Sequence, residues 1–431
     1  MIELQETINR KTVLVGARMS SDSYESFDIS MEELKGLAEA CNLEVVGEAR
    51  QNMDTEDSAT FIGIGKVDEV REIIESTGAD AAVFNNTLSP SQLNNLGNAL
   101  KVEVLDRTGL ILNIFGKRAR TKEARMQVDY AELKYMLPRL VGLRSNLSRQ
   151  GGAGGSLSNK GSGEKQIELD RRRIEKEMSA LRRGLKEIEK TREVQRKHRQ
   201  NSGIPLVSLV GYTNAGKSTL LNRLIDDYSN EVGQKVMVKD MLFATLDTTV
   251  RRITPSGHRE FLLSDTVGFI NDLPTDLVNA FHSTLEEALY ADLIIEVVDY
   301  SDPNYLMHMD VTDKTLRQLG AGNIPRVTVL NKAEKVLEPS ELPRMREDRI
   351  YISAHEGIGI EELLALIDEK LNEAAEKMEL LIPYDKSRLE NEIRSHAQIL
   401  AADYRDNGIY IEAVMKKEYV SKYQEFKLCK S

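Results

Sequence analysis

The chain has 431 residues, of which 41% are hydrophobic and 29% are charged, and its formal net charge is −11 at pH 7. This length exceeds what one hydrophobic core supports, so we expect two to four domains. No apolar run approaches the ~20 residues of a membrane span, and the polar, acidic N-terminal residues are unlike a secretory signal. Cys41 and Cys429, the only cysteines, form no metal-ligand spacing, and this cysteine usage suits a reducing cytoplasm.

Residues 1–116 alternate between strand and helix patterns. The predicted strands cover residues 12–16, 43–48 and 81–84, and the predicted helices cover 30–40, 67–76 and the residues from Ser91 onward. Ser30 is the expected N-cap of the first helix. Because strands that alternate with helices indicate a mostly parallel sheet, we predict an N-terminal α/β domain over residues 1–116.

Residues 117–200 are basic within an acidic chain. They contain 23 Lys and Arg against 11 Asp and Glu, which leaves a net charge of −23 for the remaining residues. Apolar residues recur every three or four positions over 126–140 and again over 174–188, which predicts two helices packed as an antiparallel hairpin. Pro138 should kink or loosen the first helix. The basic charge indicates either local contact with a polyanion or a solvated helical face.

A glycine-rich segment, residues 151–163, lies between the two predicted helices. Ordering glycine has the largest backbone entropy cost, so this segment cannot hold one conformation alone. It is either a flexible linker or a probe that becomes ordered on RNA. Four basic residues around it support the second interpretation: Arg144, Arg149, Lys160 and Lys165.

Residues 211–218 read GYTNAGKS, a complete phosphate-binding loop of the form GxxxxGKS. Its glycines let backbone N–H groups face the α- and β-phosphates, Lys217 can reach the β- and γ-phosphates, and the Ser218 hydroxyl can ligate Mg²⁺. A strand pattern over 206–210 precedes the loop and a helix pattern over 219–224 follows it, as such a loop requires. We predict nucleotide contacts from Gly211, Tyr212, Thr213, Asn214, Ala215, Gly216, Lys217 and Ser218.

A DxxG motif follows the apolar strand pattern of residues 261–264. Asp265 can hold Mg²⁺ through water, and the Gly268 N–H can bond the γ-phosphate. Upstream, Thr245 is the predicted switch threonine, which ligates Mg²⁺ only while a γ-phosphate is bound; Thr248 and Thr249 are alternatives. The predicted nucleotide contacts in these two segments are Phe243, Ala244, Thr245, Leu246, Asp247, Asp265, Thr266, Val267 and Gly268.

Two later motifs indicate the base. NKAE, residues 331–334, follows the strand pattern of 327–330 and resembles the guanine-reading NKxD, but Glu334 is one methylene longer than aspartate, so ATP remains an alternative to GTP. Ser-Ala-His at 353–355 is like the SAK loop, whose main-chain N–H contacts guanine O6. The predicted contacts are Asn331, Lys332, Ala333, Glu334, Ser353, Ala354 and His355. All these motifs follow predicted strands, so we expect a P-loop domain with a mostly parallel sheet over residues 201–372.

The predicted catalytic residues are Lys217, Gly268 and Thr245. Many GTPases place a glutamine directly after DxxG to orient the attacking water, whereas this chain has Phe269. Either hydrolysis is slow or absent, or water is positioned elsewhere once a partner orders the switch segments. We expect slow intrinsic hydrolysis that a partner stimulates.

Residues 373–431 are too few for a large core but enough for a small C-terminal α/β domain. Seven apolar residues are the candidates for its core: Ile382, Ile393, Leu400, Ile409, Tyr410, Ile411 and Val414. Together with the preceding segments they complete a predicted multidomain α/β chain.

These motifs make the chain similar to the HflX family of GTPases, in the Obg–HflX branch of translation-factor-related GTPases. The resemblance rests on GYTNAGKS, on FATLDTTVR at 243–251 and on DTVGFI at 265–270. Upstream stretches that general GTPases lack extend it: LDRTGLILNIF at 105–115, LSRQGG at 147–152, GSGE at 161–164 and DRRRI at 170–174. Glu334 stands where the family has aspartate, and Lys165 and Leu169 depart from a block that usually reads GPGETQLETD.

The resemblance implies a cytoplasmic, Mg²⁺-dependent GTPase that binds the large ribosomal subunit and acts in ribosome splitting or rescue under stress. The hairpin and its glycine-rich tip would then reach toward ribosomal RNA, and Thr245 would be the Mg²⁺ threonine. GTP and GDP are the expected ligands, and a monomer is expected. The alternatives are an RNA remodeller that uses ATP or GTP, and a ribosome-binding module with weak or degenerate nucleotide hydrolysis.

Overall fold

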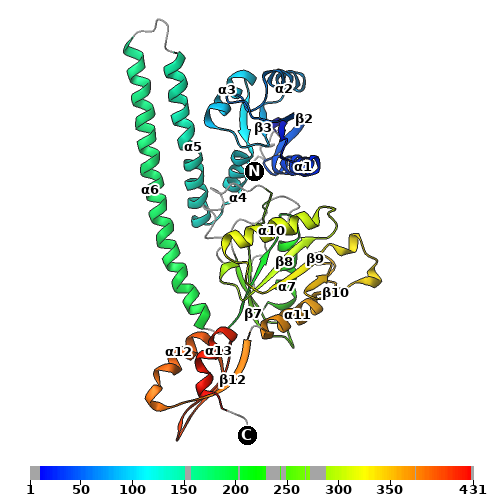
Figure 1. The fold of residues 1–431 in the computed structure, drawn as a ribbon, viewed down its shortest axis with the longest axis vertical. Coiled ribbons are helices and arrows are strands. Elements are labelled where there is room, and N and C mark those ends of the chain that lie inside the picture. Colours follow the sequence, from blue (N-terminus) through cyan, green and yellow to red (C-terminus); the bar gives the residue numbers. More distant parts are fainter. Residues whose placement is uncertain are drawn as a thin grey trace, which may run out of the picture. The chain divides into compact units, whose positions relative to one another are not determined.

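A computed structural model of the chain describes residues 10–150, 157–201, 204–229, 243, 249–266, 268–271, 288–373 and 375–428 (Figure 1). The chain divides into two compact units. The first comprises residues 1–186 with 241–243 and 271–281, and the second comprises 187–240, 244–270 and 282–431. Each unit is built around its own sheets.

The first unit contains a four-stranded parallel sheet in the order β2-β1-β3-β4. Its strands are β1 (Arg10–Met19), β2 (Leu43–Met53), β3 (Ala81–Phe84) and β4 (Glu103–Asp106), and its helices are α1 (Tyr24–Ala40), α2 (Ile64–Thr77), α3 (Pro90–Leu100) and α4 (Arg107–Arg118). Val13, Val15 and Phe84 are fully buried, as parallel strands covered on both faces require. The predicted parallel α/β architecture is confirmed.

Helix α1 begins a full turn or more before the predicted helix. Ser23 is its N-cap, and the Ser23 Oγ accepts a hydrogen bond from the Ser26 N–H at 3.1 Å. Ser30 lies inside the helix, where its Oγ accepts a hydrogen bond from Asn85 Nδ2 at 2.9 Å. The prediction of Ser30 as the cap was wrong, because the buried stripe of α1 starts at Phe27.

Two long helices, α5 (Lys122–Gln150) and α6 (Leu157–Asn201), form the predicted hairpin (Figure 1). They pack closely in the first unit, since a Cβ added to Gly184 of α6 would lie 2.3 Å from Cε of Met126 in α5. Helix α5 runs through Pro138. In the described part of the chain, no helix is long and apolar enough to cross a membrane.

The second half of the glycine-rich segment is helical, which was not predicted. Leu157–Gly163 belongs to the first turns of α6, and residues 151–156 lie outside the described residues. The prediction of an unstructured segment through Gly163 was wrong for its second half. Extending an existing helix avoids the cost of nucleating one, so the long downstream helix can carry these residues.

A buried ion pair joins α1 to α4 in the first unit. The Arg107 guanidinium pairs with the Glu33 carboxylate, and their side chains are 3% and 7% exposed. Arg107 also donates to Asn85 Oδ1 at 3.0 Å and to the main-chain oxygen of Asn271 at 3.0 Å. Removing either partner would leave the other charge buried and uncompensated, which strongly destabilises a fold.

The neighbouring Asp106 ties α4 to the hairpin. Its Oδ1 accepts hydrogen bonds from the Gly109 N–H at 2.8 Å and from the Tyr135 hydroxyl at 2.5 Å, so it caps α4 and holds α5. Arg139 of α5 donates to Asp106 Oδ2 at 3.2 Å. The adjacent residues Asp106 and Arg107 therefore connect the start of α4 to two different helices, α5 and α1.

The second unit contains a seven-stranded sheet in the order β10-β11-β9-β8-β5-β7-β6, parallel except at its two edges. Its strands are β5 (Leu206–Val210), β6 (Val250–Ile253), β7 (Phe261–Asp265), β8 (Leu293–Asp299), β9 (Arg326–Asn331), β10 (Arg344–Arg346) and β11 (Arg349–Tyr351). The mostly parallel sheet predicted for this region is confirmed.

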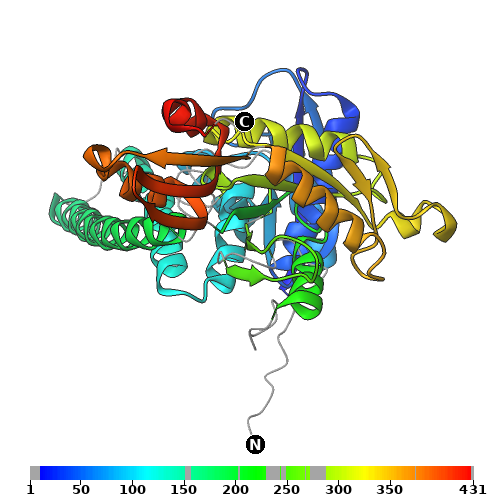
Figure 2. The ribbon, with the colours of Figure 1, turned by 90° about the horizontal axis from the view of Figure 1, so that it is seen from below.

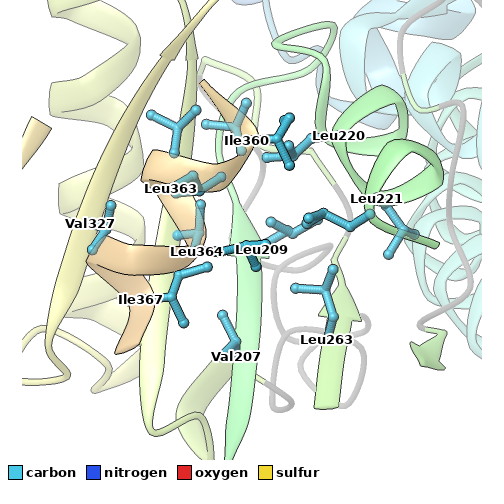
Figure 3. Close-up of a cluster of buried hydrophobic side chains, with 14 of the residues drawn as sticks. Val207, Leu209, Leu220, Leu221, Leu263, Val327, Ile360, Leu363, Leu364 and Ile367 are labelled. Atoms are coloured by element: carbon cyan, nitrogen blue, oxygen red, sulfur yellow. The ribbon is translucent and has the colours of Figure 1, made fainter. Parts of the chain in front are cut away.

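Helices cover both faces of this sheet. Helices α7 (Lys217–Tyr228) and α11 (Ile360–Glu373) share one buried cluster with the strands, in which Leu220 and Leu363 pack with Val207 (Figure 3). Helix α10 (Tyr305–Leu319) lies on the opposite face (Figure 2). The strand ends between these layers carry the predicted nucleotide motifs.

The C-terminal part is a three-stranded antiparallel sheet in the order β12-β14-β13 with two short helices. Its elements are β12 (Ala375–Ile382), α12 (Arg388–His396), β13 (Ala397–Arg405), β14 (Gly408–Lys416) and α13 (Lys417–Tyr423). Of the predicted core residues, Ile382, Ile393, Ile409 and Ile411 are buried, whereas Leu400 is 47% exposed and Tyr410 and Val414 are only partly buried. Successive strand side chains point to opposite faces, so residues 409–411 cannot all enter one core.

Replacing Arg107 with methionine should destabilise the first unit by about 3–5 kcal/mol, because it removes the cation that compensates the buried Glu33 charge. The matched control is R10M, which removes one side of the Arg10–Glu103 pair, where both side chains are 49% exposed. That exposed pair should contribute about 1 kcal/mol or less. Urea unfolding followed by circular dichroism measures both, and equal losses in the two variants would contradict the role assigned to burial.

Candidate nucleotide-binding site

The phosphate-binding loop joins the carboxyl end of β5 to the start of α7. Gly211 has a φ of 143° and Gly216 a φ of 94°. A Cβ at Gly211 would lie 2.1 Å from the Val297 oxygen, and one at Gly216 would lie 2.1 Å from Asn331 Nδ2. Both positions therefore require glycine for their backbone conformation and for the close approach of neighbouring strands.

Lys217 is buried in the first turn of α7. Its Nζ donates to the main-chain oxygens of Gly211 at 2.9 Å and Tyr212 at 2.7 Å. Burial lowers the pKa of Lys217 to about 8, while the charge of Asp265 acts in the opposite direction. The lysine is thus held over the loop by carbonyl groups that phosphate oxygens can replace.

Asp265 is brought to the loop by strand pairing. Strand β7 runs parallel to β5 with Asp265 opposite Leu209, and Asp265 is 1% exposed. The next residue, Thr266, donates its hydroxyl to the Leu209 oxygen at 2.7 Å. This register sets a buried carboxylate at the same sheet edge as the phosphate-binding loop.

The donor chemistry at this edge fits Mg²⁺. The Asp265 carboxylate and the Ser218 hydroxyl are hard oxygen donors, which Mg²⁺ prefers together with water and substrate phosphates. Among the described residues, no group of three or more His, Cys, Asp or Glu side chains is arranged to hold a metal. A metal at this site would consequently need nucleotide phosphates and water to complete its coordination.

The residues after Asp265 pair directly with the phosphate-binding loop. The Phe269 N–H donates to the Gly211 oxygen at 3.1 Å, and the Thr213 N–H donates to the Phe269 oxygen at 2.8 Å. A Cβ at Gly268 would lie 2.9 Å from Thr213 Cα and 3.0 Å from Lys217 Nζ. The structure therefore brings the predicted residues Gly268 and Lys217 together, while Val267 lies outside the described residues.

The predicted switch segment is only partly described. Phe243 belongs to the first unit, where its ring packs edge-on against Phe115 with ring centroids 4.7 Å apart. Ala244, Thr245, Leu246, Asp247 and the alternative Thr248 lie outside the described residues. Thr249 immediately precedes β6, and its main-chain oxygen accepts a hydrogen bond from the Asp265 N–H at 3.2 Å.

The first motif predicted to read the base, residues 331–334, is hydrogen-bonded to the phosphate-binding loop. Asn331 Nδ2 donates to the Ala215 oxygen at 3.0 Å, and Lys332 Nζ donates to the Asn214 oxygen at 2.8 Å. Lys332 also pairs with Asp299 Oδ2 at 2.7 Å. These side chains connect the ends of β8 and β9 to the loop, as one contiguous site requires.

Glu334 follows Lys332 in a short 3-10 helix, Ala333–Lys335, and Ala333 is buried. Its Oε2 atom is buried and makes no hydrogen bond to the described part of the chain. A buried carboxylate oxygen of this kind is costly unless a ligand supplies a donor. The base N1–H and exocyclic amine of guanine would supply two donors.

The second motif predicted to read the base, residues 353–355, lies beside the first. The Ala354 N–H, the predicted type of contact for guanine O6, donates to Asn331 Oδ1 at 3.0 Å. Ser353 is buried and its Oγ accepts a hydrogen bond from the Glu356 N–H at 3.2 Å, whereas His355 is exposed. The structure thus joins residues 331–334 and 353–355 at one edge of the sheet.

Two residues at the site were not predicted from the sequence. Asp299, the partner of Lys332, ends the apolar strand β8, and this is the same signal that pointed to Asp265. The His308 ring of α10 stacks on Tyr212 with centroids 3.9 Å apart and an angle of 12° between the rings. A lone histidine within a helix pattern carries no sequence signal for this contact.

Comparison with known proteins accounts for nearly the whole chain. Residues 28–116 match the family model described as GTP-binding GTPase N-terminal, residues 118–199 the GTP-binding GTPase Middle Region, and residues 206–332 the 50S ribosome-binding GTPase. The chain is 42% identical over 416 residues to GTPase HflX of Caldanaerobacter subterraneus subsp. tengcongensis, covering 96% of this chain and 93% of that one. The chain belongs to the HflX family of GTPases.

The chain is also similar to other known proteins. GTPase HflX of Escherichia coli K12 is 38% identical over 365 residues, with 83% of each chain covered. A crystal structure of a GTP-binding protein from Sulfolobus solfataricus with GDP aligns at a TM-score of 0.44 and 24% identity, over 84% of this chain and 99% of that one. As a member of the HflX family, the chain is a GTP-binding GTPase.

Replacing Glu334 with glutamine should weaken GTP and GDP binding by roughly 10- to 100-fold, because it removes the charged acceptor for the base donors. E334D, which keeps the charge and restores the length usual in the family, should bind GTP at least as well as the native chain. E338Q removes a charge at an exposed position and is the control. Isothermal titration with GTP, GDP and ATP measures the effect; native-like GTP binding by E334Q, or equal native affinity for ATP and GTP, would contradict guanine reading.

Proposed function

We propose that this HflX-family chain is a Mg²⁺-dependent GTPase that binds the large ribosomal subunit in a GTP-dependent way, and that hydrolysis permits its release. The observation that carries the proposal is the succession of a basic helical hairpin and a phosphate-binding domain whose family model is described as a 50S ribosome-binding GTPase. Its physiological task is ribosome splitting or rescue under stress.

In this proposal the predicted site residues act as one unit. Lys217 and the loop N–H groups hold the phosphates, while Ser218, Thr245 and Asp265, the last through water, hold Mg²⁺. Gly268 bonds the γ-phosphate, and bound Mg²⁺ neutralises the charge that develops on the phosphates. Residues 331–334 and 353–355 read guanine, which the buried Oε2 of Glu334 supports.

The hairpin supplies the contact with ribosomal RNA. The described part of α6 exposes Arg171, Arg172 and Arg173 in succession, followed by Arg182 and Arg183. Two of them pair with acids on their own helix, Arg171 with Glu175 at 2.8 Å and Arg172 with Glu168 at 3.0 Å. Exposed pairs of this kind are weak, so these guanidinium groups can turn to phosphates at little cost.

The same proposal divides the chain into four parts: residues 1–116, 117–200, 201–372 and 373–431. It places the protein in the cytoplasm as a monomer. It also includes slow intrinsic hydrolysis that the ribosome stimulates, because the Phe269 side chain is 2% exposed and cannot orient water as glutamine does. A second candidate, a ribosome-binding module or RNA remodeller with weak hydrolysis, rests on the same phenylalanine.

Removing residues 151–163 tests the role of the hairpin tip. We expect affinity for large subunits to fall at least about tenfold, since the contacts of Lys160 and of the tip backbone with RNA would be lost, and GTP affinity to stay within about twofold. The control for connectivity is a chain in which the same segment is replaced by an equally long Gly-Ser sequence. Its affinity for large subunits should fall by the same factor. Sedimentation with purified subunits measures the effect, and undiminished binding by the shortened chain would contradict the RNA-contacting role.

A further inference from the structure

Thr213, the third residue of the phosphate-binding loop, carries a buried hydroxyl that the fold does not use. Thr213 is 7% exposed, and its Oγ1 makes no hydrogen bond to any described residue. Leaving a buried hydroxyl unbonded costs free energy, so such a group in a native protein calls for an explanation. By contrast Thr266, also buried at this sheet edge, donates its hydroxyl to the Leu209 oxygen.

The Thr213 side chain lies beside Gly268 of the DxxG motif and Lys217 of the phosphate-binding loop. A Cβ at Gly268 would lie 2.9 Å from Thr213 Cγ2 and 3.0 Å from Lys217 Nζ, so three groups converge on one point. The loop lysine reaches the β- and γ-phosphates, and the DxxG glycine approaches the γ-phosphate. The unused hydroxyl therefore belongs to a side chain that lies beside Gly268 and Lys217, the two residues expected to contact the γ-phosphate.

Phe269 holds Thr213 in this position through its main chain. The Thr213 N–H donates to the Phe269 oxygen at 2.8 Å, and the Phe269 N–H donates to the Gly211 oxygen at 3.1 Å. These two bonds form a parallel bridge across Tyr212. At the position of Phe269 many GTPases have a glutamine whose side-chain amide orients water. Phe269 instead contributes its main-chain N–H and oxygen, and both groups hold the loop segment that contains Thr213.

We propose that the Thr213 hydroxyl positions the attacking water in GTP hydrolysis, in place of the missing glutamine side chain. The hydroxyl accepts a hydrogen bond from the water and donates a hydrogen bond to a γ-phosphate oxygen. The water oxygen then bonds to the γ-phosphorus, the bond to the β–γ bridging oxygen breaks with its electron pair leaving on GDP, and a water proton passes to the released phosphate. Thr213 keeps its proton throughout, so it orients the water and is not a base.

This inference rests on the proposed function, in that Mg²⁺-GTP must be hydrolysed at this site. Two substitutions separate the hydroxyl from the shape of the side chain. T213V keeps the branched shape and removes the hydroxyl, whereas T213S keeps the hydroxyl. T213A also removes the hydroxyl, with a smaller side chain, and serves if valine disturbs packing.

Single-turnover GTP hydrolysis should fall by roughly 10- to 100-fold in T213V and T213A, the size of one hydrogen bond to a charged group, and stay within about threefold in T213S. GDP affinity should remain within about twofold in all three variants. The Tm of the nucleotide-free protein should not fall in T213V, because valine removes an unbonded hydroxyl. A purely structural threonine would give the opposite signature, a lower Tm and weaker GDP binding in step with the rate.

Native hydrolysis rates in T213V and T213A would overturn the inference, as would a loss in T213S equal to that in T213V. A fall in rate matched by an equal fall in GDP affinity would also overturn it. Failure of the proposed function is distinguishable, because the native chain itself would then show no Mg²⁺-dependent hydrolysis of GTP.

Discussion

The parallel pairing of β5 with β7 is the constraint on which the nucleotide site depends. It sets Leu209 opposite Asp265. Beyond the sheet edge the two segments stay paired, because main-chain hydrogen bonds join Phe269 to Gly211 and to Thr213. Loss of this register would separate the phosphate-binding loop from the DxxG motif. Because side chains alternate along a strand, even a one-residue slip would turn Asp265 away from the loop.

The same edge gathers the remaining parts of the site. Strands β8 and β9 end in Asp299 and Asn331, whose neighbour Lys332 bonds both Asp299 and the loop. The phosphate end of the site is thereby connected to the base-reading end through side chains already paired in the protein. Glu334 Oε2 and Thr213 Oγ1 are among the buried polar atoms that make no hydrogen bond to the described residues. In the proposed function they lie at the base end and at the terminal-phosphate end of the bound nucleotide.

The sequence located the strands and motifs of the candidate site where chemistry imposes a contiguous pattern. The strand over 206–210 and the motifs at 211–218, 265–268 and 331–334 could be located because phosphate binding and base reading each need particular residues in a row after a strand. Contacts between distant segments escaped prediction. The stacking of His308 on Tyr212 and the main-chain pairing of Phe269 leave no trace in local residue patterns. The helical state of Leu157–Gly163 was missed because it depends on the long helix that follows.

In the proposed function, occupancy of this site by GTP controls binding to the large ribosomal subunit. Its most direct test is the affinity of the full chain for purified large subunits, measured with Mg²⁺ and either a non-hydrolysable GTP analogue or GDP. Binding at least about tenfold tighter with the analogue, a coupling of typical allosteric size, is the predicted result. Equal affinity in the two nucleotide states would contradict the account.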